Sequence, residues 1–207
     1  MSSGYEKQRI ALYYFLMGAK MYRPMKAMTY AEGLHPGFRK DGQTPAFAHQ
    51  VWIANMLRTL PLQEATMEEV LTLAFLHDTR EDRGISFEEI ERLFGLDIAE
   101  GVDRLTKKFR GHHVSQEIYF QRLAEHEAAC LTKGVDRLHN IASMHGVFHE
   151  DKQKSYIEET IACHLPMLKQ ARRLFPHHEA AFENIKQNLL GRIELIQPIH
   201  AVKNNPT

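Results

Sequence analysis

The chain has 207 residues, enough for one sizeable hydrophobic core and short for two, so we expect a single domain. Its 26 basic and 26 acidic residues cancel, which argues against a nucleic-acid or membrane partner, since such surfaces usually carry an excess of positive charge. No apolar run is long enough to cross a bilayer and the N-terminus lacks the order of a signal peptide, so a cytoplasmic protein is expected.

Apolar residues recur with helical spacing along nearly the whole chain, and no alternating run is long enough for a convincing strand. We therefore expect an all-α fold. The first 60 residues predict a helix over Tyr5–Tyr22 that stops near Pro24, a helix over Lys26–Leu34, a basic loop after His35-Pro36-Gly37, and a helix over Phe47–Leu60 that carries His49 near its start.

Three helix starts are indicated in the middle of the chain by capping boxes, in which an oxygen-bearing side chain stands three residues before a glutamate. The pairs are Thr66 with Glu69, Ser86 with Glu89, and Asp97 with Glu100. The first of these helices runs through apolar residues into His77 and Asp78. The segment 111–115 has the composition of a loop.

Helical periodicity resumes at about Gln116 and places Asp136, His139 and Asn140 beside an apolar stripe. Gly134 lies within this pattern, where it is less favourable than Ala by about 1 kcal/mol, so we expect another segment to approach its backbone closely. Two further helices are predicted over Lys152–Leu174 and His178–Ile196. A single domain would then span 1–197, followed by a frayed tail over 198–207.

Thirteen histidines are more than usual, and His is the commonest metal ligand. The pair His77-Asp78 alone is a weak signal, because a helix-terminal His beside a capping Asp is common. His49 and Asp136, however, stand at the polar edges of two other predicted helices, and a bundle can bring all four side chains to one centre. Two imidazoles, two carboxylates and room for water suit Mn²⁺ better than a closed structural zinc site.

The motifs of the chain occur in a recognisable order. They are His35 with Arg39-Lys40-Asp41-Gly42, Pro45 with His49, Ala74-Phe75-Leu76-His77-Asp78-Thr79-Arg80-Glu81-Asp82, Phe94-Gly95, Thr106-Lys107, Lys133 with Asp136-Arg137-Leu138-His139-Asn140, Asp151-Lys152-Gln153, and Glu159-Thr160. As a set, covering most of the chain, they resemble the hydrolase domain of RelA/SpoT-type alarmone enzymes. That resemblance implies a helical bundle of the HD class of metal-dependent phosphohydrolases.

The resemblance also implies roles for individual residues. The metal ligands would be His49, His77, Asp78 and Asp136, with Glu81 and Asp82 as the catalytic pair that positions and activates water. The residues that would contact a nucleotide substrate are Arg39, Lys40, Lys107, Asn140, Ser143 and Lys152. Asn140 and Ser143 follow Asp136 by one and two helical turns, which places the three on one face.

The chain departs from the family pattern at Ala46, at Gln50 and at Gly134-Val135, and we expect these changes to alter the pocket wall. The resemblance implies Mn²⁺-dependent removal of the 3′-pyrophosphate from ppGpp or pppGpp, or from the adenosine analogue ppApp. Two alternatives stay open. One is an HD-type nucleotide phosphatase of other specificity, and the other is a catalytically silent module that binds an alarmone.

Overall fold

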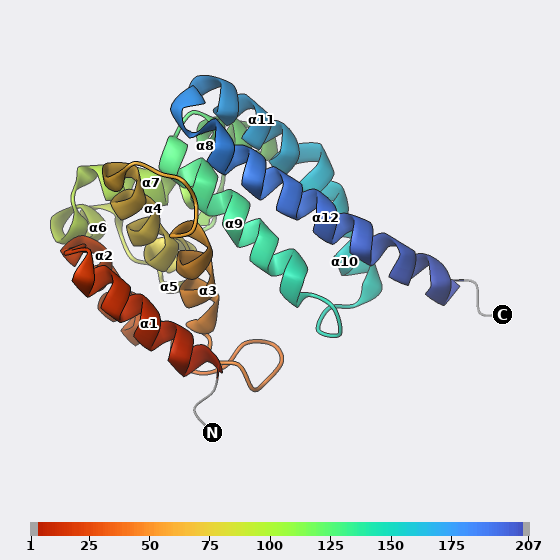
Figure 1. The fold of residues 1–207 in the computed structure, drawn as a ribbon, viewed down its shortest axis with the longest axis horizontal. Coiled ribbons are helices and arrows are strands. Elements are labelled where there is room, and N and C mark those ends of the chain that lie inside the picture. Colours follow the sequence, from red (N-terminus) through yellow and green to blue (C-terminus); the bar gives the residue numbers. More distant parts are fainter. Residues whose placement is uncertain (1–3, 205–207) are drawn as a thin grey trace.

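The computed structural model describes residues 4–204, and these form an all-helical bundle with one short hairpin (Figure 1). The helices of the first half are α1 (Gly4–Gly18), α2 (Tyr22–Leu34), α3 (Ala48–Leu57), α4 (Glu64–Leu76), α5 (Thr79–Arg83), α6 (Phe87–Phe94) and α7 (Leu96–Leu105). Those of the second half are α8 (Gln116–Ala124), α9 (Glu127–Ser143), α10 (Glu150–Glu159), α11 (Leu165–Leu174) and α12 (Glu179–Asn204). The all-α prediction is therefore confirmed. None of the described helices is long and apolar enough to cross a membrane.

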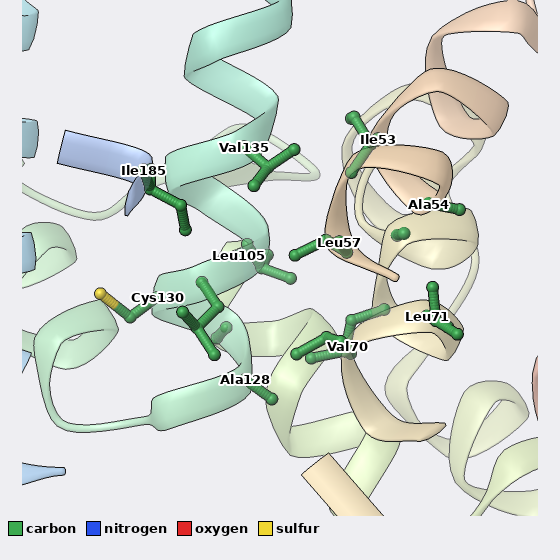
Figure 2. Packing of buried hydrophobic residues seen from close by; sticks show 14 of the residues in the cluster. Ile53, Ala54, Leu57, Val70, Leu71, Leu105, Ala128, Cys130, Val135 and Ile185 are labelled. Atoms are coloured by element: carbon green, nitrogen blue, oxygen red, sulfur yellow. The ribbon is translucent and has the colours of Figure 1, made fainter. Parts of the chain in front are cut away.

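Helix α9 is the central element of the bundle. It packs against α3, α4 and α7 on one side and against α11 and α12 on the other. Figure 2 shows Ile53 and Leu57 of α3 and Val70 of α4 on one flank of α9, with Ile185 of α12 on the opposite flank. Because α9 is covered on both flanks, most of its side chains are buried, and these include Asp136. Long helix segments are buried in this way where they form the core of a domain.

Gly134 lies where α9 meets its C-terminal neighbours. A Cβ atom added at this position would stand 2.9 Å from Cγ2 of Ile185 and 3.1 Å from Cδ2 of Leu168. The expectation of a close approach to this backbone is thus confirmed, since α11 and α12 both press their side chains against it. The glycine admits this packing although it lowers the helical propensity of α9.

Two helix boundaries near the N-terminus differ from the prediction. The first helix ends at Gly18, before a left-handed Lys20, and the second begins at Tyr22 and so includes Pro24 in its first turn. Proline is tolerated in a first turn because the N–H groups there have no partner within the helix. The prediction that Pro24 stops the first helix was wrong for this reason.

Of the three predicted capping boxes, one is confirmed. The hydroxyl of Ser86 accepts the backbone N–H of Glu89 at the start of α6. Thr66 and Asp97 do not cap helices, because α4 begins at Glu64 and α7 begins at Leu96. Asp97 instead accepts a hydrogen bond from Arg23 at 2.5 Å, which ties α7 to α2. An acidic or hydroxyl side chain near a helix start therefore has other partners available.

The second half of the chain holds three departures from the predicted pattern. Residues 108–113 form a two-stranded antiparallel hairpin, β1 (Lys108–Phe109) with β2 (His112–His113), where a loop was expected from residue 111. The predicted helix over 152–174 is interrupted by a π-helical turn, Thr160–His164. Helix α12 continues to Asn204, past the predicted end at Ile196. The domain limit at 197 stays a prediction, and the last three residues of the predicted tail lie outside the described residues.

The close packing at Gly134 generates a stability prediction. Gly134→Ala should lower the free energy of unfolding by about 1–2 kcal/mol, since overpacking against Ile185 and Leu168 outweighs the gain in helix propensity. Gly191→Ala in α12 is the matched control, because nothing lies within 4 Å of its added Cβ, and it should raise the free energy of unfolding by roughly 0.5–1 kcal/mol. Denaturant unfolding of both variants checks this. A Gly134→Ala protein as stable as the control would contradict the packing argument.

Candidate metal centre and substrate pocket

Three mutually packed helices bring the predicted metal ligands together. His49 lies in the first turn of α3, His77 directly follows the buried end of α4, and Asp78 precedes α5. Asp136 lies in α9, which packs against both α3 and α4. Each ligand stands at the edge of an apolar stripe that faces the core, so burial of the stripes determines where the ligands meet.

The ligand atoms of these residues converge on one point. Those of His49, His77 and Asp78 all lie within 4.8 Å of one another. Oδ1 of Asp136 is 3.1 Å from Nε2 of His49 and 3.9 Å from Nε2 of His77. The structure therefore brings together all four residues that the sequence predicted as ligands.

The tautomer of His77 fits a metal ligand. Its Nδ1 lies 2.9 Å from the carbonyl oxygen of Ala74 and donates to it, which leaves Nε2 as the atom that would bind a cation in place of a proton. Nε2 is buried and lies 2.9 Å from Oδ1 of Asp78, yet it has no hydrogen bond of acceptable geometry within the described part of the chain. A buried imidazole nitrogen beside two carboxylates and a second imidazole suits a divalent cation.

The electrostatics of the centre favour positive charge. Burial alone would lower the pKa of His77, but the carboxylates of Asp78 and Asp136 outweigh it and raise this pKa to about 9. Burial would raise the pKa of Asp136, yet Lys133, His49 and His77 hold it well below its ordinary value. Both carboxylates thus stay ionised, and a cation placed between them would compensate their charge.

A cavity of about 390 Å³ opens beside these ligands, within the size range of small-molecule sites. Among the predicted residues it is lined by Arg39, Lys40, His49, Asp78, Asp82, Asp136, Asn140 and Ser143. Asp41, Lys133, Val147 and Phe148 complete the lining. The lining combines cations, carboxylates and apolar side chains, which suits an anionic molecule with a flat ring.

Two loops meet across this cavity, one after α2 and one after α9 (Figure 1). Nη2 of Arg39 donates to the hydroxyl of Ser143 at 3.5 Å, and Nζ of Lys40 stands 5.0 Å from the ring centre of Phe148. Asn140 donates to Oδ1 of Asp136 at 2.7 Å, which joins this wall to the metal ligands. Four of the predicted substrate contacts therefore lie in one pocket.

The predicted catalytic pair divides between two environments. Asp82 lines the cavity, and burial together with the carboxylate of Asp78 raises its pKa above the ordinary value. Glu81 is exposed outside the lining, where its carboxylate accepts the backbone N–H of Lys108 at 2.9 Å and so holds the hairpin against α5. A carboxylate with a raised pKa beside the metal centre suits proton transfer near neutral pH.

Lys107 and Lys152 lie outside the cavity lining. Nζ of Lys107 is 3.7 Å from the carboxylate of Glu159, which also pairs with Arg137. Lys152 places its ammonium 4.7 Å from the ring centre of Phe148, next to the cavity wall. Their roles as substrate contacts stay predictions.

The expectation that the departures from the family pattern alter the pocket wall was wrong for these residues. None of Ala46, Gln50, Gly134 and Val135 lines the cavity. Gln50 and Val135 are buried in the core faces of their helices, and Gly134 faces α11 and α12. Val147 and Phe148, from the loop after α9, line the cavity instead, and no pattern in the sequence indicated either residue.

Sequence reasoning assigned no role to two polar residues that touch the ligands. Lys133 stands one turn before Asp136 and donates to its Oδ2 at 2.8 Å. His139 lies with Nδ1 2.8 Å from Nδ1 of His49, and burial with the nearby His49 and Arg39 lowers the pKa of His139 to about 3. Their spacing of three residues on either side of Asp136 is the signal that would have indicated both.

A second cluster of ligand-type residues, Glu127 with His177 and His178, lies at the far end of α9. His178 is buried, with Nε2 accepting the backbone N–H of Gln63 at 3.0 Å. Its Nδ1 must then carry the proton that it donates to Glu127 at 2.8 Å. Both nitrogens are thus committed to hydrogen bonds, and this cluster ties α9 to neighbouring segments instead of presenting a lone pair.

Comparison with known proteins gives a match to the HD domain family over residues 27–174. Among curated proteins, the chain is 33% identical over 150 residues to a GTP pyrophosphokinase rsh of Brucella ovis, which covers 69% of this chain and 19% of that protein. It is 30% identical over 188 residues to the bifunctional (p)ppGpp synthase/hydrolase SpoT of Escherichia coli, covering 84% of this chain and 26% of that protein. The chain therefore spans only about a fifth to a quarter of the length of these relatives.

One solved structure, described as a metazoan ortholog of SpoT that hydrolyzes ppGpp, superimposes with a TM-score of 0.62. The sequences are 24% identical, and the match covers 84% of this chain and 94% of the other. This likeness establishes a shared fold, in agreement with the helical bundle predicted for an HD domain.

The convergence of the four ligands predicts the effect of removing one. His77→Ala should weaken Mn²⁺ binding by at least about 100-fold, because a buried ligand whose tautomer is fixed by Ala74 cannot be replaced by a neighbouring side chain. His177→Ala, in the second cluster, is the matched control and should bind like the unaltered chain. Titration calorimetry with Mn²⁺ on metal-free protein measures both. Equal affinities for the two variants would place the metal elsewhere.

Proposed function

The chain belongs to the HD-domain family, and from this premise we propose that it is a metal-dependent phosphohydrolase that removes the 3′-pyrophosphate of an alarmone nucleotide. The substrate would be ppGpp or pppGpp, or the adenosine analogue ppApp, and the products a nucleotide and pyrophosphate. The observation that carries the proposal is one cavity whose lining holds His49, Asp78, Asp136 and Asp82 together with Arg39 and Lys40, with His77 buried beside His49 and Asp78. The names of the relatives, which include a guanosine-3′,5′-bis(diphosphate) 3′-pyrophosphohydrolase of Shigella flexneri, agree with this reaction.

We propose Mn²⁺ as the resident cation, held by His49, His77, Asp78 and Asp136. Two imidazoles and two carboxylates suit a cation of intermediate hardness, and the site opens to a cavity instead of closing around the ion as a structural zinc site does. When bound, such a cation polarises a phosphoryl oxygen and lowers the pKa of water. The predicted cytoplasmic location is consistent with a nucleotide substrate and stays a prediction.

The residues of the chain supply the remaining chemistry. As the oxygen of water forms its bond to the phosphorus attached to the 3′-oxygen, Asp82 accepts a proton from that water. The bond from this phosphorus to the 3′-oxygen then breaks, the 3′-oxygen takes a proton from solvent, and pyrophosphate leaves. Asp82 returns its proton to solvent before the next turnover. The raised pKa of Asp82 makes it a stronger base than an ordinary aspartate.

The other cavity walls would orient the nucleotide. Arg39 and Lys40 would meet phosphate oxygens or stack on the base, since a guanidinium does both. Asn140 and Ser143 line the side between these cations and the ligands, where they would reach the ribose and the 3′-pyrophosphate. Val147 and Phe148 offer an apolar surface for the base at the outer end, next to Lys152.

Turnover of ppGpp and ppApp, measured side by side with Mn²⁺ and after chelation, tests the proposed reaction. We expect release of pyrophosphate that chelation abolishes and that added Mn²⁺ restores. Release of orthophosphate would instead favour an HD-type nucleotide phosphatase of other specificity. Intact substrates, with either nucleotide bound in a calorimetric titration, would indicate a silent alarmone-binding module and would contradict the proposal.

The two environments of the catalytic pair predict how each carboxylate contributes. Asp82→Asn should lower kcat by about 10²–10⁴-fold, the range for loss of a general base, and should leave Mn²⁺ affinity unchanged. The family resemblance pairs Glu81 with Asp82 in activating water, so Glu81→Gln should also lower kcat without loss of metal, although Glu81 lies outside the cavity lining. The amide oxygen of the variant can still accept the N–H of Lys108. This variant therefore removes the negative charge of Glu81 and keeps its hydrogen bond to the hairpin. Full activity of Glu81→Gln would assign Glu81 to the hairpin alone.

A further inference from the structure

The imidazole of His49 has a second contact, on the side away from the other ligands. Its Nδ1 lies 2.8 Å from Nδ1 of His139, and the two ring centres are 4.8 Å apart. His139 in turn packs against Trp52, with ring centres 4.6 Å apart and planes inclined by 50°. The ligand His49 is therefore the first member of a stack of three rings that leads away from the metal centre.

Which of the two nitrogens carries the shared proton follows from the proposed role of His49 as a ligand. Two nitrogens 2.8 Å apart share one proton, so one ring donates and the other accepts. Nε2 of His49 faces Asp136 and the other ligands, and it must keep its lone pair to bind a cation. His49 then carries its proton on Nδ1 and donates it to Nδ1 of His139, which has its own proton on Nε2.

The two helices that supply ligands also supply the supporting rings. Trp52 follows His49 by three residues in α3, and His139 follows Asp136 by three residues in α9. Residues three apart share a helix face, so the contact between α3 and α9 that joins His49 to Asp136 also joins Trp52 to His139. Trp52 packs against the core, which limits how far His139 can move.

We propose that His139 is a positioning residue for the metal centre, which accepts the Nδ1–H of His49 and thereby fixes the tautomer and ring orientation of this ligand. This inference rests on the proposed metal site and goes beyond it, since it assigns to a second histidine the role that a carboxylate or carbonyl oxygen commonly has behind a ligating His. Ala74 has the corresponding role for His77, through its carbonyl oxygen.

A purely structural role for His139 predicts that different substitutions are tolerated. If the ring only fills space against Trp52, then any aromatic side chain of similar size will serve. If Nδ1 is what matters, an acceptor atom at the same place will serve even without a ring. His139→Phe keeps the ring and removes the acceptor, whereas His139→Asn places an amide oxygen close to the position of Nδ1 and removes the ring.

The test measures Mn²⁺ affinity by titration calorimetry and the absorption spectrum of the Co²⁺ form, with no nucleotide present. We expect His139→Phe to weaken Mn²⁺ binding by about 10–100-fold, the range found when the partner of a ligating His is removed. His139→Asn should stay within about threefold of the unaltered chain. His112→Phe on the exposed strand β2 is the matched control and should leave affinity and spectrum unchanged. Thermal unfolding of the metal-free proteins shows that each variant is folded.

The outcomes separate the two roles. Full affinity in His139→Phe, a loss confined to His139→Asn, or an equal loss in both would overturn the proposal. A chain that binds Mn²⁺ but cleaves no alarmone would refute the proposed function and leave this test intact. An unaltered chain that fails to bind Mn²⁺ would overturn the metal centre and this inference together.

Discussion

The contact of α9 with α3 and α4 is the constraint on which the rest of the structure depends. Each of these helices buries an apolar stripe and carries a ligand at or beyond the edge of that stripe. Packing of the three apolar stripes against one another is therefore sufficient to bring His49, His77 and Asp136 together. Gly134 belongs to the same arrangement, because it lets α11 and α12 close the other flank of α9 and so holds this helix in place.

The charges of the site follow from this burial. An ionised carboxylate in the core is costly unless it is paired and hydrogen-bonded, and Asp136 receives hydrogen bonds from Lys133 on one oxygen and Asn140 on the other. Oδ1, which accepts from Asn140, also faces His49 and His77, the two histidines proposed as ligands. The lysine thus compensates part of the negative charge and leaves one oxygen directed at the centre. The remaining charge of the two carboxylates is what a divalent cation would compensate.

The sequence allowed the fold class and the convergence of the ligands to be predicted, because both depend on helical periodicity and on residue type. The contacts of individual side chains were harder to predict from the sequence, because they depend on partners in distant segments of the chain. Ser86 caps a helix as predicted, whereas Asp97 has the same spacing but binds Arg23 of a distant helix. Glu81 and Asp82 are neighbours in sequence, yet only the folded chain shows that one holds a hairpin and the other faces the cavity. The spacing of His139 from Asp136 places both residues on one helix face, but its partner His49 is 90 residues away and could be identified only in the folded chain.

The residues proposed for catalysis lie in or next to helices, whereas the residues proposed to bind the substrate base lie in loops. The proposed chemistry depends on residues in or next to packed helices, where neighbouring side chains and backbone carbonyls fix their orientation. The substrate wall depends on the loops after α2 and α9, which carry Arg39, Lys40, Val147 and Phe148. Loops tolerate substitution and insertion better than packed helices do, so substrate choice can change while the reaction stays the same. The residues that decide between guanine and adenine should therefore be sought in these two loops, since Asn140 and Ser143 of α9 are assigned to the ribose and the 3′-pyrophosphate.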